Sequence, residues 1–565
     1  MSTLSPLRQL TSRTIFACLL ATLCSPVAYA AQSANAPQIL SSSGAFRIAG
    51  TIVNAIGGNP LARARVSIFD ASNPQNRRSL VTSEDGRFEF KQLSPGKYAL
   101  QGAKRGFITA AYDEHESFST AIVTGAGFDT EHLVLRLSPS AVLSGKILDE
   151  SGEPVRHASV SLYREDRQVG VGRIVKFRVA ITDDLGAYEF AQLDAGSYFV
   201  SVAAQPWYAS HPRSSQQPDA QNLPTAVDQS LDVAYPVTYY GDSTEPDDAT
   251  PIPIRGGDRL QADVHLNAVA ALHLLFHVPD NGEHGFSLPM FQKPSFDGVE
   301  NVQTGGGDQV SPGVFEVTGI APGRYSVRDP SDGQGNEANE IDITTNGQEL
   351  EAPHAVALSS VKATVQALGG GATLPPHIDI GLRNGKMRFV AWQEADAKGE
   401  IEFQSLSPGT YDVLPFAMGL TPPKAFSVVR ISSPGSETAG HTLNVAPGSS
   451  MTVTLSLIGS NGDVDGFAKH AGKAVSGAMV VLVPADPESH RELFRRDQSD
   501  QDGSFSLRSV IPGTYTIVAI ENGWDLDWSR PGVIAHYAKQ AQTVTVTEHS
   551  PTSIHLVDPV EVQPR

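Results

Sequence analysis

One short phrase occurs five times along this chain of 565 residues. Its first copy, residues 86–98, reads Gly-Arg-Phe-Glu-Phe-Lys-Gln-Leu-Ser-Pro-Gly-Lys-Tyr. The other copies begin at Gly186, Gly313, Gly399 and Gly503. In each copy a second glycine follows after ten residues and a tyrosine two residues later. Because this spacing returns at intervals of 86 to 127 residues, it predicts one small β-domain used five times in tandem.

The phrase has the pattern of a strand, a tight turn and a returning strand. Phe88 and Phe90 are two residues apart, so both side chains project from one face of a strand into a core. Pro95 and Gly96 supply the turn, in which we expect Gly96 to adopt a positive φ. Tyr98 then lies on the returning strand, and we expect its ring to be buried and its hydroxyl to reach a backbone group near the turn.

A second, looser phrase precedes the first one in three of the copies, over residues 48–68, 143–162 and 464–482. It alternates apolar strands with polar turns, which is typical of a small antiparallel sandwich. The third and fourth copies are degenerate in this part.

The predicted fold is therefore all-β, a tandem array of five small antiparallel β-sandwich domains of immunoglobulin-like or prealbumin-like type after a signal peptide. The predicted segments are a signal peptide (1–30), a flexible leader (31–44) and sandwiches at 45–138, 139–270 (with a long insertion near 204–240), 271–358, 359–457 and 458–565.

Together the two phrases resemble the carboxypeptidase regulatory-like domain, a transthyretin-like sandwich. Residues 235–241 and 252–257 also resemble a longer variant of this domain. The resemblance implies a secreted bacterial protein with domains often arranged in series and a carbohydrate-binding-like fold. It implies no activity, since the family is named for a domain that accompanies a peptidase without being one.

The amino terminus indicates export. Arg8 and Arg13 form a basic start, residues 15–23 are apolar, and Ala28-Tyr29-Ala30 has the small-x-small pattern of a cleavage site. The apolar run is too short to span a bilayer. We expect cleavage after about Ala30, a periplasmic or extracellular mature chain, and no transmembrane segment within it.

Composition limits the partners of the mature chain. Both cysteines, Cys18 and Cys24, lie in the predicted signal peptide, so the mature chain has no disulfide, no thiolate nucleophile and no cysteine-ligated zinc. The full chain carries a net charge of −19. Such a negative charge argues against nucleic acid as a partner.

No catalytic motif is found. The sequence has no Gly-x-Ser-x-Gly elbow, no His-Glu-x-x-His helix, no phosphate-binding loop and no dinucleotide fingerprint. His273 and His277 share one face of a strand but lack a third ligand. Asp500 and Asp502 suggest a charged hairpin tip more than a weak calcium site. We therefore expect no catalytic, cofactor-binding or metal-ligating residue, and no cofactor.

Loop aromatics are the candidate ligand contacts. Tryptophan and tyrosine rings beside carboxylates can stack on sugars, but such rings also pack between neighbouring domains or anchor loops. Packing is the favoured interpretation. They lie in the 204–240 insertion and in the last repeat: Trp207, Tyr208, Tyr239, Tyr240, Trp524 and Trp528.

Two functions follow from these patterns. The first is a non-catalytic, exported scaffold that spaces, adheres or binds, with a polysaccharide or an extracellular protein or peptide as candidate partner. The alternative is a hydrolase, or an accessory protein of a peptidase, with its site in the insertion of the second domain.

Overall fold

The computed structural model describes most of the chain after residue 44. The described ranges are 45–71, 73–125, 127–212, 228–277, 289–328, 339–351, 358–368, 374–385, 388–417, 419–420, 424–460, 462–539, 541–550 and 552–565. No helix within these ranges is long and apolar enough to cross a membrane. The predicted signal peptide and leader lie outside them.

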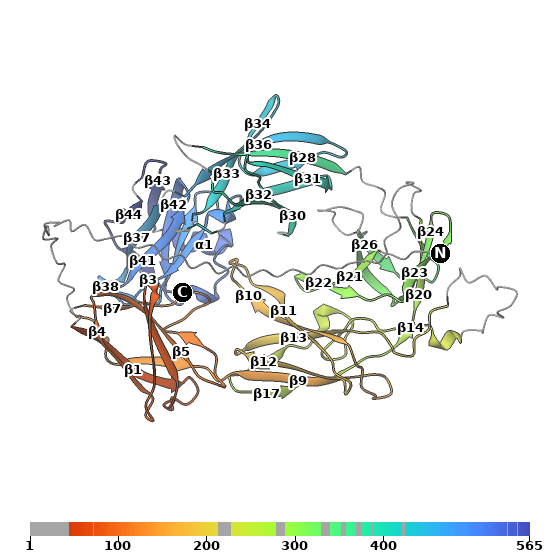
Figure 1. The fold of residues 1–565 in the computed structure, drawn as a ribbon, viewed down its shortest axis with the longest axis horizontal. Coiled ribbons are helices and arrows are strands. Elements are labelled where there is room, and N and C mark those ends of the chain that lie inside the picture. The colour runs from red at the N-terminus through yellow and green to blue at the C-terminus, as the bar shows by residue number, and fades with distance from the viewer. Residues whose placement is uncertain are drawn as a thin grey trace, which may run out of the picture. The chain divides into compact units, whose positions relative to one another are not determined.

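Residues 46–137, which we call the N-terminal sandwich, form two sheets (Figure 1). One sheet has the order β4 (Arg87–Leu93), β1 (Phe46–Asn54), β8 (Leu133–Leu137). The other contains β3 (Asn73–Val81), β2 (Arg65–Asp70), β5 (Gly96–Ala103), β6 (Ala110–Ala111) and β7 (Ile122–Thr124). Alternating apolar residues from both sheets, among them Ile48, Phe88 and Leu100, meet in one core.

Residues 141–270 repeat this plan with additional strands. The first sheet consists of β12 (Ala187–Leu193), β9 (Ala141–Leu148), β17 (Arg259–Gln261) and β18 (Val264–His265). The second consists of β11 (Arg173–Ile181), β10 (Ser159–Asp166), β13 (Gly196–Ala203), β15 (Thr238–Tyr239) and β16 (Ile252–Ile254). A short pair, β14 (Val233–Ala234) and β19 (Val269–Ala270), lies beside them.

Residues 272–351 form two four-stranded sheets with a smaller core. The first has the order β23 (Gly306–Ser311), β24 (Val314–Ile320), β20 (Leu272–His277), β27 (Gln348–Glu351). The second has the order β22 (Gly298–Val302), β21 (Met290–Ser295), β25 (Gly323–Arg328), β26 (Asn339–Ile343).

Residues 359–459 form a sandwich of five strands against four, named here the 359–459 sandwich. Its first sheet has the order β31 (Glu400–Leu406), β28 (Ser359–Ala367), β36 (Ser450–Gly459), β33 (Phe426–Ser433), β34 (Ser436–Ala439). Its second sheet has the order β30 (Phe389–Glu394), β29 (Ile378–Arg383), β32 (Gly409–Ala417), β35 (Thr442–Val445). Twenty buried apolar residues fill the space between the two sheets.

Residues 462–563 form the C-terminal sheet, which has nine strands. They are β37 (Gly462–His470), β38 (Lys473–Ala474), β39 (Met479–Pro484), β40 (Arg495–Gln498), β41 (Ser504–Val510), β42 (Gly513–Ile520), β43 (Gln542–Val546), β44 (Ser553–His555) and β45 (Val560–Gln563). Its buried residues form two clusters, and the second of these includes Ile534 and Tyr537 of the helix α1 (Pro531–Ala538).

The predicted all-β class is confirmed, with one addition to the expected antiparallel pairing. In each of these strand groups the first long strand pairs antiparallel with the strand of the repeated phrase and parallel with a strand near the end of the group. The division into five domains with the boundaries given above stays a prediction.

The repeated tyrosine is placed as expected in all five copies. Each ring is at most 8% exposed. Each hydroxyl donates a hydrogen bond to the carbonyl oxygen four residues earlier, at 2.6–3.1 Å. The five tyrosines are Tyr98, Tyr198, Tyr325, Tyr411 and Tyr515. These rings therefore fix the phrase to the core, and binding is left to other residues.

The expected positive φ at the second glycine is found in two of the five copies, at Gly96 (158°) and Gly323 (155°), and both values are close to extended backbone. Gly196, Gly409 and Gly513 are not among the residues with positive φ. The left-handed residue lies four positions earlier, where a register shift marks a β-bulge in the strand pair. The left-handed residues are Gln92, Gln192, Gly319, Ser405 and Ser509. The bulge absorbs the change of direction that we had assigned to the Pro-Gly turn.

Candidate functional site

Three of the predicted ligand-contact aromatics are buried. Trp524 and Trp528 are 7% and 6% exposed and belong to the second cluster of the C-terminal sheet. The Trp524 ring stacks on His115 of the N-terminal sandwich, with centroids 5.2 Å apart and planes within 7°. Tyr239 is fully buried and packs edge-on against Phe296. These positions agree with the favoured interpretation of these rings as packing.

The insertion of residues 204–240 presents one open ring. Trp207 is 75% exposed. Its neighbour Tyr208 donates a hydrogen bond to Glu150, which also accepts one from Tyr235. Tyr240 is half-buried against the core of the 141–270 strands. Residues 213–227 of the insertion lie outside the described part of the chain, so ligand contact at Trp207 and Tyr208 stays a prediction.

The aspartates of the last hairpin are engaged by the chain itself. Asp500 forms an ion pair with Lys97 at 2.7 Å and accepts a hydrogen bond from the amide of Ala121 at 2.8 Å. Asp502 accepts one from the amide of Ser504. These contacts are those of a hairpin tip docked on the N-terminal sandwich.

Both ring nitrogens of His273 are also engaged by side chains of the protein. Its two ring nitrogens lie 2.7 Å from Asp232 Oδ2 and 3.1 Å from Glu316 Oε1, in a largely buried network that continues from Asp232 to His211. A histidine with both nitrogens bonded to carboxylates has a structural role in the core.

An aromatic platform that the sequence analysis missed lies on the outer face of the β30–β29–β32–β35 sheet. It consists of Phe389, Trp392 and Phe416. Trp392 stacks on Phe416 with centroids 4.5 Å apart, and Phe389 meets both rings edge-on at 5.5 and 5.6 Å. Phe389 is 49% and Trp392 44% exposed. Large rings held open to solvent in one patch are a typical ligand-contact feature.

A glycine makes room for the platform. Gly381, on the central strand β29, lies directly opposite Trp392 in the register. A Cβ atom at Gly381 would come within 2.9 Å of the Phe389 ring and 3.0 Å of the Trp392 ring. The two rings therefore rest against the backbone of β29, and any side chain at this position would lift them.

A β-bulge explains why the platform was missed. Phe389 and Trp392 are three residues apart, so a regular strand would send their side chains to opposite faces. The register shifts between Leu382 and Arg383, where the partner changes from Ala391 to Phe389 and Val390 is passed over. The skipped residue brings both rings to one face. The sequence signal was only a pair of aromatics in a repeat that we had described as degenerate.

Carboxylates lie beside the platform. Asp379 is the direct register partner of Phe416 on one side and of Glu394 on the other, so these side chains share one face of the sheet. Glu394 Oε1 lies 2.7 Å from Nδ1 of His377. A flat apolar surface with acceptor groups at its edge can stack on a sugar ring and accept hydrogen bonds from its hydroxyls.

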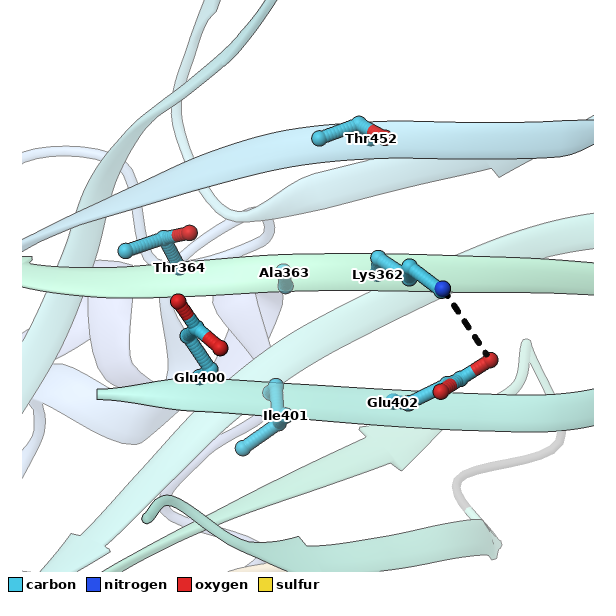
Figure 2. Close-up of a pocket in the computed structure, with 7 residues that line it drawn as sticks. All are labelled: Lys362, Ala363, Thr364, Glu400, Ile401, Glu402 and Thr452. Carbon is cyan, nitrogen blue, oxygen red and sulfur yellow. Dashed lines mark ion pairs between the residues drawn. The ribbon is translucent and has the colours of Figure 1, made fainter. Parts of the chain in front are cut away.

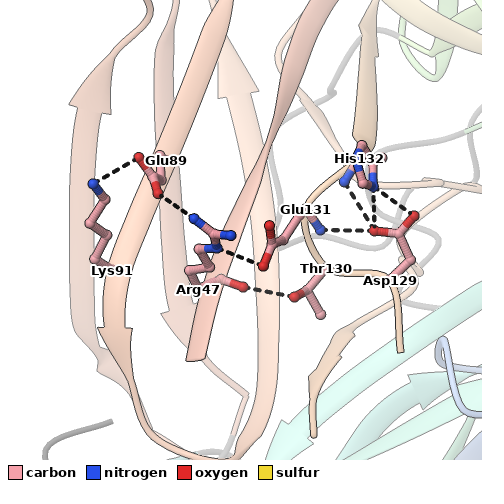
Figure 3. Close-up of polar contacts among 7 residues, drawn as sticks. All are labelled: Arg47, Glu89, Lys91, Asp129, Thr130, Glu131 and His132. Atoms are coloured by element: carbon pink, nitrogen blue, oxygen red, sulfur yellow. Dashed lines mark hydrogen bonds and ion pairs between the residues drawn. The ribbon is translucent and has the colours of Figure 1, made fainter. Parts of the chain in front are cut away.

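Two other polar surfaces are weaker candidates. A hollow of about 390 Å³ lies on strands β28, β31 and β36. Lys362 and Glu402 line it and form an ion pair at 3.9 Å (Figure 2). On the N-terminal sandwich the exposed Arg47 bridges Glu131 at 2.6 Å and Glu89 at 3.6 Å (Figure 3). The charged groups at both surfaces form exposed ion pairs, which contribute little energy.

Comparison with known families supports the resemblance drawn from the sequence. Residues 47–132 and 142–231 match the carboxypeptidase regulatory-like domain. Residues 462–547 match the second β-sandwich domain of the NOMO1-like subunits of the BOS complex. No curated protein matches the chain.

Among solved structures, several bacterial proteins show a distant likeness. The TIE protein of Bacillus anthracis has 13% identity and a TM-score of 0.17, over 73% of this chain and 74% of that one. A streptococcal ancillary pilin has 14% identity and a TM-score of 0.19, over 54% and 98%. The pilus adhesin SpaC of Lactobacillus rhamnosus GG has 12% identity and a TM-score of 0.17, over 73% and 43%.

Proposed function

We propose, on the premise that two of its segments are carboxypeptidase regulatory-like domains, that this chain is an exported, non-catalytic scaffold whose 359–459 sandwich binds a polysaccharide. The observation that carries the proposal is the aromatic platform of Phe389, Trp392 and Phe416 over Gly381. The other four predicted sandwiches then serve as spacers that present this face. The division into five is part of the proposal.

The chemistry of the platform favours a sugar over a peptide. Two of its rings are about half exposed, and they are held in place by one another and by the glycine beneath them, so little side-chain entropy is lost when a ligand stacks on them. The adjoining Asp379 and Glu394 offer acceptors, and Glu394 also pairs with His377. A sugar ring matches this surface because it has an apolar C–H face and hydroxyl donors at its rim.

A glycan array with residues 31–565 tests the proposal. Trp392→Ala removes the largest ring of the platform from the surface, and we expect it to weaken binding of any captured polysaccharide at least about tenfold, or about 1.4 kcal/mol. Trp207→Ala is the control, because it removes a tryptophan that is even more exposed, at 75% against 44% for Trp392, and that lies outside the platform.

Either of two results contradicts the proposal. Full glycan binding by Trp392→Ala, with loss in Trp207→Ala, would move the site to the insertion. Turnover of a peptide or glycan that disappears on deletion of residues 204–240 would favour the alternative function, a hydrolase or peptidase accessory.

A further inference from the structure

Three potential metal ligands meet where the 359–459 sandwich contacts the C-terminal sheet. His441 directly precedes β35, and His490 and Glu492 lie in the connection between β39 and β40. One donor atom from each of the three lies within 4.8 Å of the other two. Nδ1 of His490 is 3.2 Å from Glu492 Oε1, and Nδ1 of His441 is 3.9 Å from the same oxygen.

Two of these groups have atoms that nothing else satisfies. Within the described ranges, neither His441 Nδ1 nor Glu492 Oε2 has a hydrogen-bond partner, although both atoms are buried. The His441 residue is only 4% exposed. An unpaired polar atom in the interior is unfavourable. Because His441 Nδ1 lies 3.9 Å from the Glu492 carboxylate that carries the second unpaired atom, the two together indicate that something binds between these groups.

The other ring nitrogen of His441, Nε2, lies beside a carboxylate. Its Nε2 lies 3.5 Å from Asp412 Oδ1. Asp412 also pairs with Arg383 at 2.9 Å, and its contacts with His441 and Arg383 hold the pKa of its carboxyl below the ordinary value. A carboxylate behind one nitrogen of a histidine fixes the ring and the tautomer, and leaves the other nitrogen as a lone-pair donor.

We propose that His441, His490 and Glu492 bind a Zn²⁺ ion. Two imidazole nitrogens and one carboxylate form a donor set that zinc accepts, with a fourth position left for water. Calcium and magnesium prefer oxygen ligands and do not fit this set. Zinc bonds of about 2.1 Å place tetrahedral ligand atoms roughly 3.4 Å apart. Only a small closing of the side chains is needed, and His490 is exposed enough to move.

The proposed ion joins two parts of the chain. His441 belongs to the 359–459 sandwich, whereas His490 and Glu492 belong to the C-terminal sheet. The bound ion would therefore hold these two parts together. It would lie beside the β30–β29–β32–β35 sheet that also carries the aromatic platform, since Asp412 lies on β32 together with Phe416. The site is independent of the proposed polysaccharide binding because it shares no residue with the platform.

Zinc titration of the metal-free mature chain tests the proposal, with calorimetry for affinity and elemental analysis for stoichiometry. We expect one tightly bound Zn²⁺ per chain and no binding of Ca²⁺ at this site. His490→Ala and Glu492→Gln should each weaken Zn²⁺ binding at least tenfold. Asp412→Asn, which leaves the three ligands in place and weakens the support behind His441 together with the pair to Arg383, should weaken it by about 10–100-fold.

His377→Ala is the matched control. His377 pairs with Glu394 at 2.7 Å on the same sandwich, but it belongs to an exposed pair with no third ligand in the described part of the chain. This variant should bind zinc as the parent chain does. His490 and Glu492 lie on a surface connection, so folding of their variants can be verified by circular dichroism.

Two results overturn the proposal. One is the absence of saturable zinc binding by the folded parent chain. The other is equal loss of binding in His490→Ala and His377→Ala, which would mean that surface histidines capture the ion indiscriminately.

Discussion

Replacement of Gly503 by alanine tests how the repeated phrase holds its sandwich together. Gly503 opens the last copy of the phrase and has a φ of 79°. A Cβ atom there would lie 2.6 Å from the carbonyl oxygen of Ala468, which is too close for any unstrained contact. That oxygen accepts a hydrogen bond from Val475, and the amide of Ala468 donates one to the Gly503 oxygen.

Gly472 is the matched control for this variant. It lies in the same C-terminal sheet with the same φ of 79°, and no atom lies within 4 Å of a Cβ built on it. Gly472→Ala should therefore lower the free energy of unfolding only by the strain of placing alanine in the left-handed conformation, about 1–2 kcal/mol. A few tenths of this are regained because alanine restricts the unfolded chain more than glycine does. Gly503→Ala should lower the free energy of unfolding by the same amount and should also weaken the two backbone hydrogen bonds at Ala468, each of which contributes about 1 kcal/mol. We expect losses of about 1 and about 3 kcal/mol.

Urea unfolding of the mature chain, followed by tryptophan fluorescence, measures the difference. Trp524 and Trp528 are buried in the C-terminal sheet, whereas Trp207 and Trp392 are well exposed and change little on unfolding. The signal therefore reports the sheet that carries both glycines. If the two variants lose the same free energy of unfolding, the close approach to Ala468 contributes nothing and the reasoning fails.

Three further outcomes are expected. Tyr515→Phe should cost about 1 kcal/mol by losing the bond to Ile511, and Tyr515→Ala about 3–5 kcal/mol by emptying a core site; equal unfolding midpoints for the two would contradict burial of the ring. Gly196→Ala should cost less than about 1 kcal/mol in thermal unfolding, because φ is not positive there and the nearest atom is 3.6 Å away; a loss above about 2 kcal/mol would restore the turn at the second glycine as the strained element. Burial raises the pKa of Asp497 to about 6, above its value of about 3.9 in an unfolded chain, so its ionisation destabilises the C-terminal sheet progressively as the pH rises from about 4 to about 6. Asp497→Asn should therefore gain stability relative to the parent chain at about pH 7 and little at about pH 4, and a gain independent of pH in urea titrations would refute this assignment.

The sequence pattern predicted those features of the fold that depend on neighbouring residues and that recur in each copy of the phrase. The alternation of Phe88 and Phe90, the burial of the five tyrosines and their bond to the chain four residues earlier all follow from spacing within one hairpin. The change of direction was assigned to Gly96, whose φ is positive but nearly extended. The left-handed backbone occurs instead at Gln92, a residue with a side chain, where a bulge overrides the usual glycine preference.

The two proposed binding sites could not be predicted in this way because they depend on contacts between distant parts of the chain. The platform needs a skipped residue at Val390 and a ring from another strand, Phe416. The proposed zinc ligands His441 and His490 come from different sheets, with no motif spacing between them. Only the fold brings these groups together.

The parallel pairing of the first strand of a sandwich with its last has a mechanical consequence. In the 359–459 sandwich, β28 and β36 run side by side in the same direction, from the pair Ser360 and Ser450 to the pair Ala367 and Leu457. The chain therefore enters this sandwich at one end and leaves it at the other. Tension along the chain slides the two strands past each other and loads all their hydrogen bonds at once, whereas antiparallel terminal strands would unzip one bond at a time. A module of this topology is suited to bear load between a surface and whatever it holds.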